Sequence, residues 1–385
     1  MNFNSLTLDS TRWQEVNEHE IECKMHYLSG KNILITGVCG TVGSELAREL
    51  LEGDDYNVGK LVGIDNNETE LFFIDQRFLN DARASFLLAD MHDQASLTDA
   101  MEGIDVVFHT AAFKHVILCE RSPNQAVNTN INGVTNLIRA AKQANVEKVI
   151  FTSSDKAVNP TNVMGTSKLM GERLITAANN SRELRTVFAS TRFGNVLGSN
   201  GSVIPIFKKQ IASGGPVTLT DPEMTRFVMT VEESVKLIID SAEVACGGEV
   251  FITKMPILRI KDLAEVMIDL ITGNGDMKID VIGSKPGEKL YEELMSEEET
   301  RRAVELERYF AVKPAFSGFY KNVDFDYKNV VSETVTNPYV SSKEKTMTKA
   351  EIAEFLVANN LLDHEVDSSK EMLQRYWPGD KEEKQ

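Results

Sequence analysis

Two ionisable side chains stand next to each other where a predicted strand ends. Asp155 and Lys156 follow the apolar run Lys148–Ser153, with Ser154 between the run and the pair. Ligands of open α/β sheets bind at the carboxyl ends of the strands, so this pair can supply a general acid and a general base to a bound molecule. An ion pair that only caps the strand is the structural alternative, and spacing alone does not decide between the two.

A glycine-rich turn between the first predicted strand and the first predicted helix can hold a phosphate. Its sequence is Thr36-Gly37-Val38-Cys39-Gly40-Thr41-Val42-Gly43. Glycines permit a tight turn and a close approach to a pyrophosphate, whose charge is favoured by the N–H groups that begin a helix. Asp65 lies 22 residues beyond Gly43 at the end of the second strand, where a carboxylate accepts hydrogen bonds from a ribose 2′-OH and repels a 2′-phosphate. The pattern favours NAD over NADP, with a purely structural turn as the alternative.

The elements that must position these residues alternate regularly along the first half of the chain. The strand candidates are Asn32–Thr36, Lys60–Asp65, Ser85–Ala89, Val106–Thr110, Lys148–Ser153, Thr186–Arg192 and, later, Glu249–Ile252. Amphipathic helices are predicted between them, for example over Val42–Leu51 and Asn132–Gln143. Nearly continuous apolar strands separated by helices indicate a parallel sheet covered on both faces, and therefore a doubly wound, Rossmann-like α/β fold.

The sequence predicts four parts. These are an N-terminal arm over 1–30, helical around Trp13–Cys23; an NAD-binding domain over 31–195, with a later strand near 249–252; a smaller, discontinuous substrate-binding cap mainly over 196–330; and a C-terminal loop, helix and tail over 331–385. Thr348 and Glu351 have the capping-box spacing that begins the late helix.

The composition disfavours several classes of function. Of 385 residues, 41 are Lys or Arg and 58 are Asp or Glu, which gives a net charge of −17 and argues against nucleic acid as a partner. The four cysteines form no CxxC pair, so neither a disulfide framework nor a metal site is expected. No apolar run reaches the roughly 18–20 residues of a membrane span and no signal peptide is recognisable, so we expect a cytoplasmic protein without membrane insertion.

Over roughly residues 30–300 the chain resembles an extended short-chain dehydrogenase/reductase, and more narrowly the nucleotide-sugar 4,6-dehydratases of bacterial polysaccharide and glycan synthesis. Besides the glycine-rich turn, the motifs that carry the resemblance are Thr110–His115, Asn128–Gly133, Ser154–Gly165 with Lys168, Arg192–Val196, Gly201–Pro205, Gly215–Val217, Thr220–Pro222, Thr225–Phe227 and Lys285–Lys289. The stretch Asp155-Lys-Ala-Val-Asn-Pro160 is the most specific of them. The resemblance implies a tightly bound, recycled NAD and a homo-oligomer.

The turn and the resemblance together define the expected cofactor site. Its residues are Gly37, Gly40, Thr41, Val42, Gly43, Asp65, Asn66, Asp90, Met91, Ala111, Ala112 and Lys168. Asp90 and Met91 would lie beside the adenine, although an aspartate at a strand end needs no ligand to explain it.

One departure from the broad family bears on the chemistry. That family has a Tyr four residues before the Lys, whereas this chain has Met164 before Lys168. A thioether cannot titrate as a phenol does, so another group is expected to act as the base. A subset of sugar-nucleotide dehydratases resembles this chain in having Met there, so activity is expected, with Met164 packing or shaping the pocket. Most helical lysines are solvated, and only the cofactor motif upstream marks Lys168 as a site residue.

The resemblance implies roles in a dehydration for the residues around the pair. Asp155 would protonate the departing C6 hydroxyl, and Lys156, with a pKa depressed by burial, would remove the C5 proton. Ser154 would hydrogen-bond the C4 oxygen, and Lys168 would orient the nicotinamide ribose. The base for the C4 hydroxyl stays open among Asp155, Lys156 and a water held by Ser154.

The implied substrate is a UDP-linked amino sugar, most simply UDP-N-acetylglucosamine. The residues expected to contact it are Lys114, His115, Asn195, Gly201, Ser202 and Arg226. Gly201 and Ser202 open a predicted helix that can hold a phosphate, and Arg226 can pair with the diphosphate. A salt bridge for Arg226, a loop hydrogen bond for Asn195 and a structural role for His115 are the alternatives. Acidic runs such as Glu292-Glu293 are expected to lie away from this site.

The sequence therefore predicts an NAD-dependent hydro-lyase that forms UDP-4-keto-6-deoxy-N-acetylhexosamine with retention at C5. An inverting or 5-epimerising dehydratase is one alternative. A nucleotide-sugar 4-epimerase or reductase is another, although it needs no acid–base pair at C5 and C6. A non-catalytic NAD-binding scaffold is a third.

Overall fold

The computed structural model describes residues 26–180, 186–199, 202–273, 275–283, 287–320 and 323–362. The helix predicted around Trp13–Cys23 lies outside the described residues, as do Gly201 and the C-terminal tail beyond 362. Within the described ranges, no helix is both long and apolar enough to cross a lipid bilayer.

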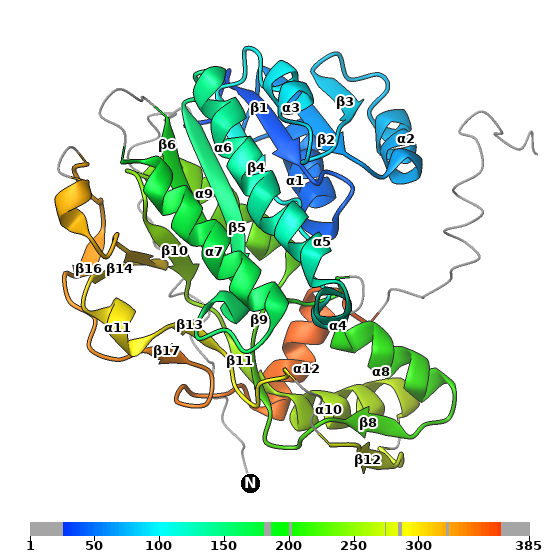
Figure 1. Ribbon diagram of the computed structural model, residues 1–385. Helices are drawn as coiled ribbons and strands as arrows, with labels where there is room; N and C mark the ends of the chain where they lie inside the picture. Colours follow the sequence, from blue (N-terminus) through cyan, green and yellow to red (C-terminus); the bar gives the residue numbers. More distant parts are fainter. Residues whose placement is uncertain are drawn as a thin grey trace, which may run out of the picture.

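A ten-stranded sheet forms the centre of the described part of the chain (Figure 1). Its order is β16-β14-β15-β10-β6-β5-β4-β1-β2-β3, and the strands from β10 to β3 are parallel. These parallel strands are β1 (Asn32–Thr36), β2 (Lys60–Asp65), β3 (Ala84–Leu88), β4 (Val106–His109), β5 (Lys148–Ser154), β6 (Val187–Phe193) and β10 (Val250–Thr253). The predicted strands are confirmed, with ends that differ by one residue at β3, β4, β5, β6 and β10.

Helices cover both faces of the parallel strands, which confirms the doubly wound α/β fold. The helices of this layer arrangement are α1 (Thr41–Glu52), α2 (Glu68–Arg77), α3 (Gln94–Ala100), α6 (Gly133–Gln143), α7 (Val163–Ala178) and α9 (Val231–Val244). On one face α1 and α9 pack together through residues such as Leu46 and Ile238; on the other, α3, α6 and α7 bury Leu97, Leu137 and Ile175. Each helix presents apolar residues at three- and four-residue spacing to the sheet.

Between β4 and α6 the chain forms three short helical segments: α4 (Val116–Arg121), α5 (Pro123–Val127) and the π-helical turn η2 (Asn128–Asn132). After β5 comes a single 3₁₀ turn, η3 (Asp155–Ala157). These segments lie at the carboxyl ends of the parallel strands, so the edge where ligands of such sheets bind is built from them.

An antiparallel extension enlarges the sheet beyond β10. It consists of β14 (Ala303–Leu306), β15 (Tyr309–Val312) and β16 (Val330–Ser332). The stretch 196–330, predicted to be mainly cap, includes β14 and β15, which form a tight hairpin that pairs with β10 in the main sheet. The apolar inward residues Val304 and Ala311 join the same core as β1 and β10, which explains the placement.

The cap gathers segments that are far apart in the sequence. It contains the helices α8 (Val203–Ala212), α10 (Ile260–Thr272) and α12 (Lys349–Ala358). It also contains one strand pair, β8 (Val217–Leu219) with β12 (Ile279–Val281). These elements share one apolar core, which includes Phe207, Leu263 and Leu356. Thr348 and Glu351 form the predicted capping box at the start of α12.

Short strands connect the cap to the main sheet. They are β7 (Asn195–Val196), β9 (Thr225–Met229) and β11 (Ile257–Arg259) in one small sheet, and β13 (Glu293–Met295) with β17 (Tyr339–Val340) in another. Two further short segments are α11 (Glu297–Thr300) and η4 (Ser317–Phe319).

A buried ion triad ties three of these elements together. The Arg192 guanidinium on β6 donates to both carboxylate oxygens of Glu172 on α7, at 2.8 and 2.7 Å, and to both of Glu299 on α11, at 2.9 and 2.7 Å. All three side chains are almost fully buried. The planar fork of arginine suits this doubly bidentate pairing, which fixes the chain around 292–299 to the helix that carries Lys168.

Replacing Arg192 with Met should lower the free energy of unfolding by about 3–5 kcal/mol, because two buried carboxylates would lose their counter-charge. Chemical denaturation measures this change. The matched control is Arg77→Met, whose partner Glu52 is exposed, and it should cost less than about 1 kcal/mol. Equal, small losses in both variants would contradict a stabilising role of the triad.

Candidate active site

The predicted cofactor residues converge on a crevice at the carboxyl ends of β1, β2 and β4. A cavity of about 310 Å³ is lined there by Gly37, Cys39, Gly40, Ile64, Asp65, Asn66, Asn67, Ala89, Asp90, Met91, Thr110, Ala111, Ala112, Phe113 and Thr129. Thr41 lines a separate cavity beside α1, and Gly43 is buried under the turn. The structure therefore brings most of the expected set together.

The glycine turn suits a dinucleotide because glycine has no side chain, so the backbone of the turn can pack closely against neighbouring backbone. Gly37 has a φ of +72°, and a Cβ there would lie 2.6 Å from the Cα of Ala111. A Cβ on Gly43 would lie 2.3 Å from the carbonyl oxygen of Gly37. Gly40 immediately precedes α1 and gives it no side-chain cap, and the first turn of the helix carries no acidic residue. The N–H groups of that turn therefore remain available to an anion.

The Asp65 carboxylate holds the loops at the far end of the crevice. It accepts hydrogen bonds of 3.0 Å from the backbone N–H groups of Cys39 and Asn67. Each oxygen keeps a second lone pair, so the carboxylate can still accept from a ribose hydroxyl.

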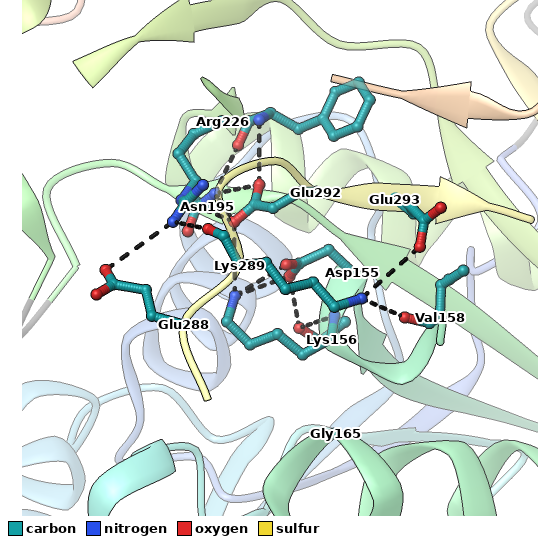
Figure 2. A network of polar contacts seen from close by, with 12 residues as sticks. Asp155, Lys156, Val158, Gly165, Asn195, Arg226, Glu288, Lys289, Glu292 and Glu293 are labelled. Atoms are coloured by element: carbon teal, nitrogen blue, oxygen red, sulfur yellow. Dashed lines mark hydrogen bonds and ion pairs between the residues drawn. The ribbon is translucent and has the colours of Figure 1, made fainter. Parts of the chain in front are cut away.

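A larger cavity, of about 600 Å³, lies between the main sheet and the cap. It is lined by His115, Val116, Ile117, Leu118, Asp155, Lys156, Asn162, Asn195, Arg226, Gly287, Glu288, Lys289 and Glu292. Its charged residues come from η3, β9 and the segment before β13, which are distant in the sequence. Their polar contacts form the network of Figure 2.

The buried Asp155 and the half-buried Lys156 form the η3 side of this network. The Asp155 carboxylate, 2 % exposed, accepts a 2.7 Å hydrogen bond from the Ser154 hydroxyl. The Lys156 ammonium donates to both Asp155 oxygens at 3.0 Å, while its side chain is 32 % exposed on the cavity side. An ion pair is thus present, but it lines a cavity and does not simply cap the strand.

Glu292 occupies the centre of the network, which corrects the expectation that the Glu292-Glu293 run lies away from the site. Its carboxylate is 3 % exposed and accepts hydrogen bonds from the Asn195 amide at 2.9 and 2.8 Å. The Arg226 Nε lies 3.2 Å and the Lys156 Nζ 3.8 Å from Oε1. The run looks like solvated surface in the sequence because nothing local marks one glutamate as buried. Its position just after the motif Lys285–Lys289 was the available signal.

The charges in this cluster shift one another's pKa values. Burial alone would raise the pKa of Asp155, but the Lys156 charge and the hydrogen bonds from Ser154 and Lys156 hold it below the usual value. Burial alone would lower the pKa of Lys156, but Asp155 and Glu292 raise it. The expectation that burial depresses this pKa is therefore wrong for the protein without ligands. Burial, and then the charge of Asp155, raise the pKa of Glu292 to about 7.

Lys168 and Met164 are both buried on α7. The Lys168 ammonium donates to the Thr152 carbonyl at 2.9 Å and lies over the Phe151 ring, 4.8 Å from its centroid. Burial, partly offset by Glu172, lowers its pKa to about 8. Met164 packs in a small apolar cluster with Cys119 and Ala126, so it has the packing role that the sequence left open.

The remaining predicted substrate residues are distributed unevenly. Asn195, Arg226 and the exposed His115 line the large cavity, and Lys114 lines a smaller one beside it. Arg226 is already engaged, because it donates to the carbonyls of Thr225 and Lys289 at 2.8 Å as well as pairing with Glu292. Ser202 stands at the N-terminus of α8 and is not among the residues that line the large cavity.

Local packing fixes the η3 turn against α7. The Asn162 side chain caps α7 by accepting from the Gly165 N–H at 2.8 Å. A Cβ on Gly165 would lie 2.2 Å from the Lys156 carbonyl oxygen, so only glycine permits this approach (Figure 2). From the opposite side, the Lys289 ammonium donates to the Val158 carbonyl at 2.7 Å. No group of three or more His, Cys, Asp or Glu side chains suited to a metal ion occurs in the described residues.

Comparisons with known proteins agree with this architecture. A protein called an uncharacterized membrane protein, from Methanocaldococcus jannaschii, is 48 % identical over 295 residues, which are 75 % of this chain and 87 % of that protein. A UDP-N-acetylglucosamine 4,6-dehydratase (inverting) from Campylobacter jejuni is 38 % identical over 299 residues, 77 % of this chain and 87 % of the relative. A UDP-glucose 4-epimerase from Rickettsia bellii is 36 % identical over 349 residues, 88 % and 99 % of the two chains.

A solved structure and a family model complete the comparison. The X-ray structure of Pen from Bacillus thuringiensis has a TM-score of 0.79 and 38 % identity, and the match covers 87 % of this chain and 99 % of that one. Residues 33–314 match the model of the family described as polysaccharide biosynthesis protein. The named relatives of known activity are nucleotide-sugar dehydratases and epimerases. The chain therefore belongs to the polysaccharide biosynthesis family of extended short-chain dehydrogenases/reductases.

Proposed function

We propose that this protein removes water from UDP-N-acetylglucosamine to give a UDP-4-keto-6-deoxy sugar, with NAD held throughout the cycle. The observation that carries the proposal is the ion pair of the buried Asp155 with the half-buried Lys156, which faces a cavity of about 600 Å³ at the carboxyl ends of the strands. An acid and a base side by side suit an elimination across two adjacent carbons. The similarity to the Campylobacter jejuni dehydratase supports the same reaction.

The crevice around Gly37 would hold the cofactor. The N–H donors at the start of α1 would bind its pyrophosphate, and Asp65 would accept from the adenosine ribose. When bound there, NAD⁺ would supply the hydride acceptor for C4 of the sugar and the hydride donor for C6. Lys168 would orient the nicotinamide ribose. Because its pKa is about 8, both its charged and its uncharged form are populated near pH 7.

Asp155 would move the proton of the C4 hydroxyl to the departing C6 hydroxyl. Because its pKa is lowered, the carboxylate is ionised at the start and can accept this proton through the Ser154 hydroxyl, 2.7 Å away. Protonated Asp155 then donates to the C6 oxygen as the C–O bond breaks. This assignment needs no phenol, which is consistent with the buried Met164.

The Lys156 amine would take the proton from C5 and later protonate the same carbon with one of its N–H protons, which exchange with solvent. Retention at C5 follows in this proposal, because the same amine acts from one side and Met164 cannot donate a proton from the other. The relatives named as inverting make inversion the second candidate. In either case the 4-keto group is formed first, since it acidifies the C5–H bond.

The remaining cavity residues would bind the nucleotide sugar. His115 is exposed to the large cavity and Lys114 to the smaller one beside it. Arg226 would reach a diphosphate only if it gave up part of its bonding to Lys289 and Glu292. Its more direct contribution is to hold Glu292. Ser202, at the start of α8, stays a proposed phosphate contact, as does Gly201, which lies outside the described residues.

Incubation of the purified protein with UDP-N-acetylglucosamine in D₂O, without added cofactor, tests the function. We expect release of a 4-keto-6-deoxy product with deuterium at C5 and with the configuration at C5 retained. Proton NMR of the product measures both. A C4-epimerised sugar with an intact C6 hydroxyl would instead support an epimerase, and no reaction together with bound NAD would support a scaffold.

Asp155→Asn should lower kcat by at least about 100-fold with little change in substrate binding, because the amide cannot relay a proton. Steady-state kinetics and isothermal titration separate the two effects. Asp99→Asn, on the exposed surface of α3, is the matched control and should behave as the native protein. Near-native turnover of Asp155→Asn would refute the acid assignment.

A further inference from the structure

Lys156 must lose a proton before it can act as a base. Its ammonium contacts Asp155 at 3.0 Å and lies 3.8 Å from Glu292, and both carboxylates raise its pKa. A base must first lose that proton to an acceptor within reach. Asp155 is not available for this purpose, because in the proposed cycle it carries the proton of the C4 hydroxyl.

We propose that Glu292 accepts the proton of the Lys156 ammonium and so converts Lys156 into the free amine that attacks the C5 proton. The inference rests on the proposed dehydration and assigns Glu292 as a positioning residue that acts through Lys156. It explains why a carboxylate from the segment before β13 is buried in the cavity beside the η3 turn (Figure 2).

The protons balance over one cycle. The C4 hydroxyl proton passes to Asp155. The Lys156 Nζ then closes from 3.8 Å to hydrogen-bond distance of Glu292 Oε1, one N–H bond of Lys156 breaks, and an O–H bond forms on Glu292. The free amine then takes the C5 proton while Asp155 gives its proton to the departing water. When hydride has returned to C6, Lys156 protonates C5 with one of its N–H protons and recovers one from Glu292. No external proton donor or acceptor is needed.

The charges around the pair favour this transfer at the right moment. Once Asp155 is neutral, the Lys156 ammonium loses the partner that raises its pKa most, while the neighbouring Arg226 cation still lowers that pKa. Glu292 keeps the hydrogen bonds of Asn195 and the Phe227 N–H, so its carboxyl stays in place whether ionised or neutral. The transfer is therefore coupled to the first proton step.

Glu292 is suited to accept and release a proton near neutral pH. The charged groups that face it are Asp155 and Lys156 from η3 and Arg226 from β9, and Glu288 approaches Arg226 at 3.9 Å from the same side. Burial and the charge of Asp155 bring its pKa to about 7, close to the operating pH at which a base works best, and burial, the larger of the two effects, persists when Asp155 becomes neutral. In its protonated form Glu292 hydrogen-bonds Asp155 and cannot accept.

Glu292→Gln keeps the size of the side chain but cannot accept the proton. In single turnovers in D₂O we expect near-native formation of reduced nicotinamide, read by its near-ultraviolet absorbance, and at least about 100-fold slower deuterium exchange at C5 and release of water. In the native protein the exchange rate should rise with pH through about 7, the pKa of Glu292, and this rise should be absent in the variant.

Two further variants serve as references. Glu293→Gln changes the next residue, whose carboxylate binds Asn159 and Lys289, and it should keep both the rate and the pH profile. Glu292→Asp retains a carboxylate and should recover part of the exchange rate together with a pH-dependent rise. If Glu292→Gln does not fold, the native profile and the Asp variant decide the question alone.

Each outcome has a distinct meaning. Native-like exchange and an unchanged pH profile in Glu292→Gln would overturn the inference while leaving the dehydration intact. Equal loss of the hydride step and of exchange would also overturn it, because it would show a structural role only. A native protein that forms no 4-keto-6-deoxy product would overturn the proposed function itself, and the inference with it.

Discussion

The site depends on the burial of two carboxylates and two cations in contact with one another. Asp155, Lys156, Glu292 and Arg226 would each be unfavourable if desolvated alone, and they are tolerated because every charge has an opposite one nearby. Such a cluster is compact in space, but its members come from η3, β9 and the segment before β13. Much of the architecture between the main sheet and the cap serves to bring these three segments together.

The fold fixes this arrangement from several sides. Gly165 lets α7 approach the η3 turn from below, and Lys289 reaches the Val158 carbonyl from the cap side. The Arg192 triad joins α7 to the chain that follows Glu292. The Ser341 hydroxyl also holds Glu292, because it accepts a 2.9 Å hydrogen bond from the Glu292 backbone N–H. Because a proton moves only over short distances, this rigidity is a functional requirement as well as a source of stability.

The sequence predicts those features that depend on local pattern. The parallel strands, the glycine turn with Asp65 and the capping box at Thr348 follow from apolar periodicity and from short-range spacing, and the structure has all of them. Glu292 was not predictable in the same way. Its burial depends on Asn195 and Arg226, which lie far away in the chain, and on their folding into short strands of the small sheet. The direction of the Lys156 pKa was missed because the sequence shows neither the close contact with Asp155, which raises this pKa most, nor the presence of Glu292, which adds to the rise.

A crystal structure with NAD and UDP-N-acetylglucosamine would test the central claim most directly. The account predicts the C6 hydroxyl within hydrogen-bond distance, about 3 Å, of Asp155, with C5 facing the Lys156 nitrogen. It also predicts that Glu292 keeps its contact with Asn195. A hexose bound with C5 and C6 turned away from Asp155 and Lys156 would contradict the account.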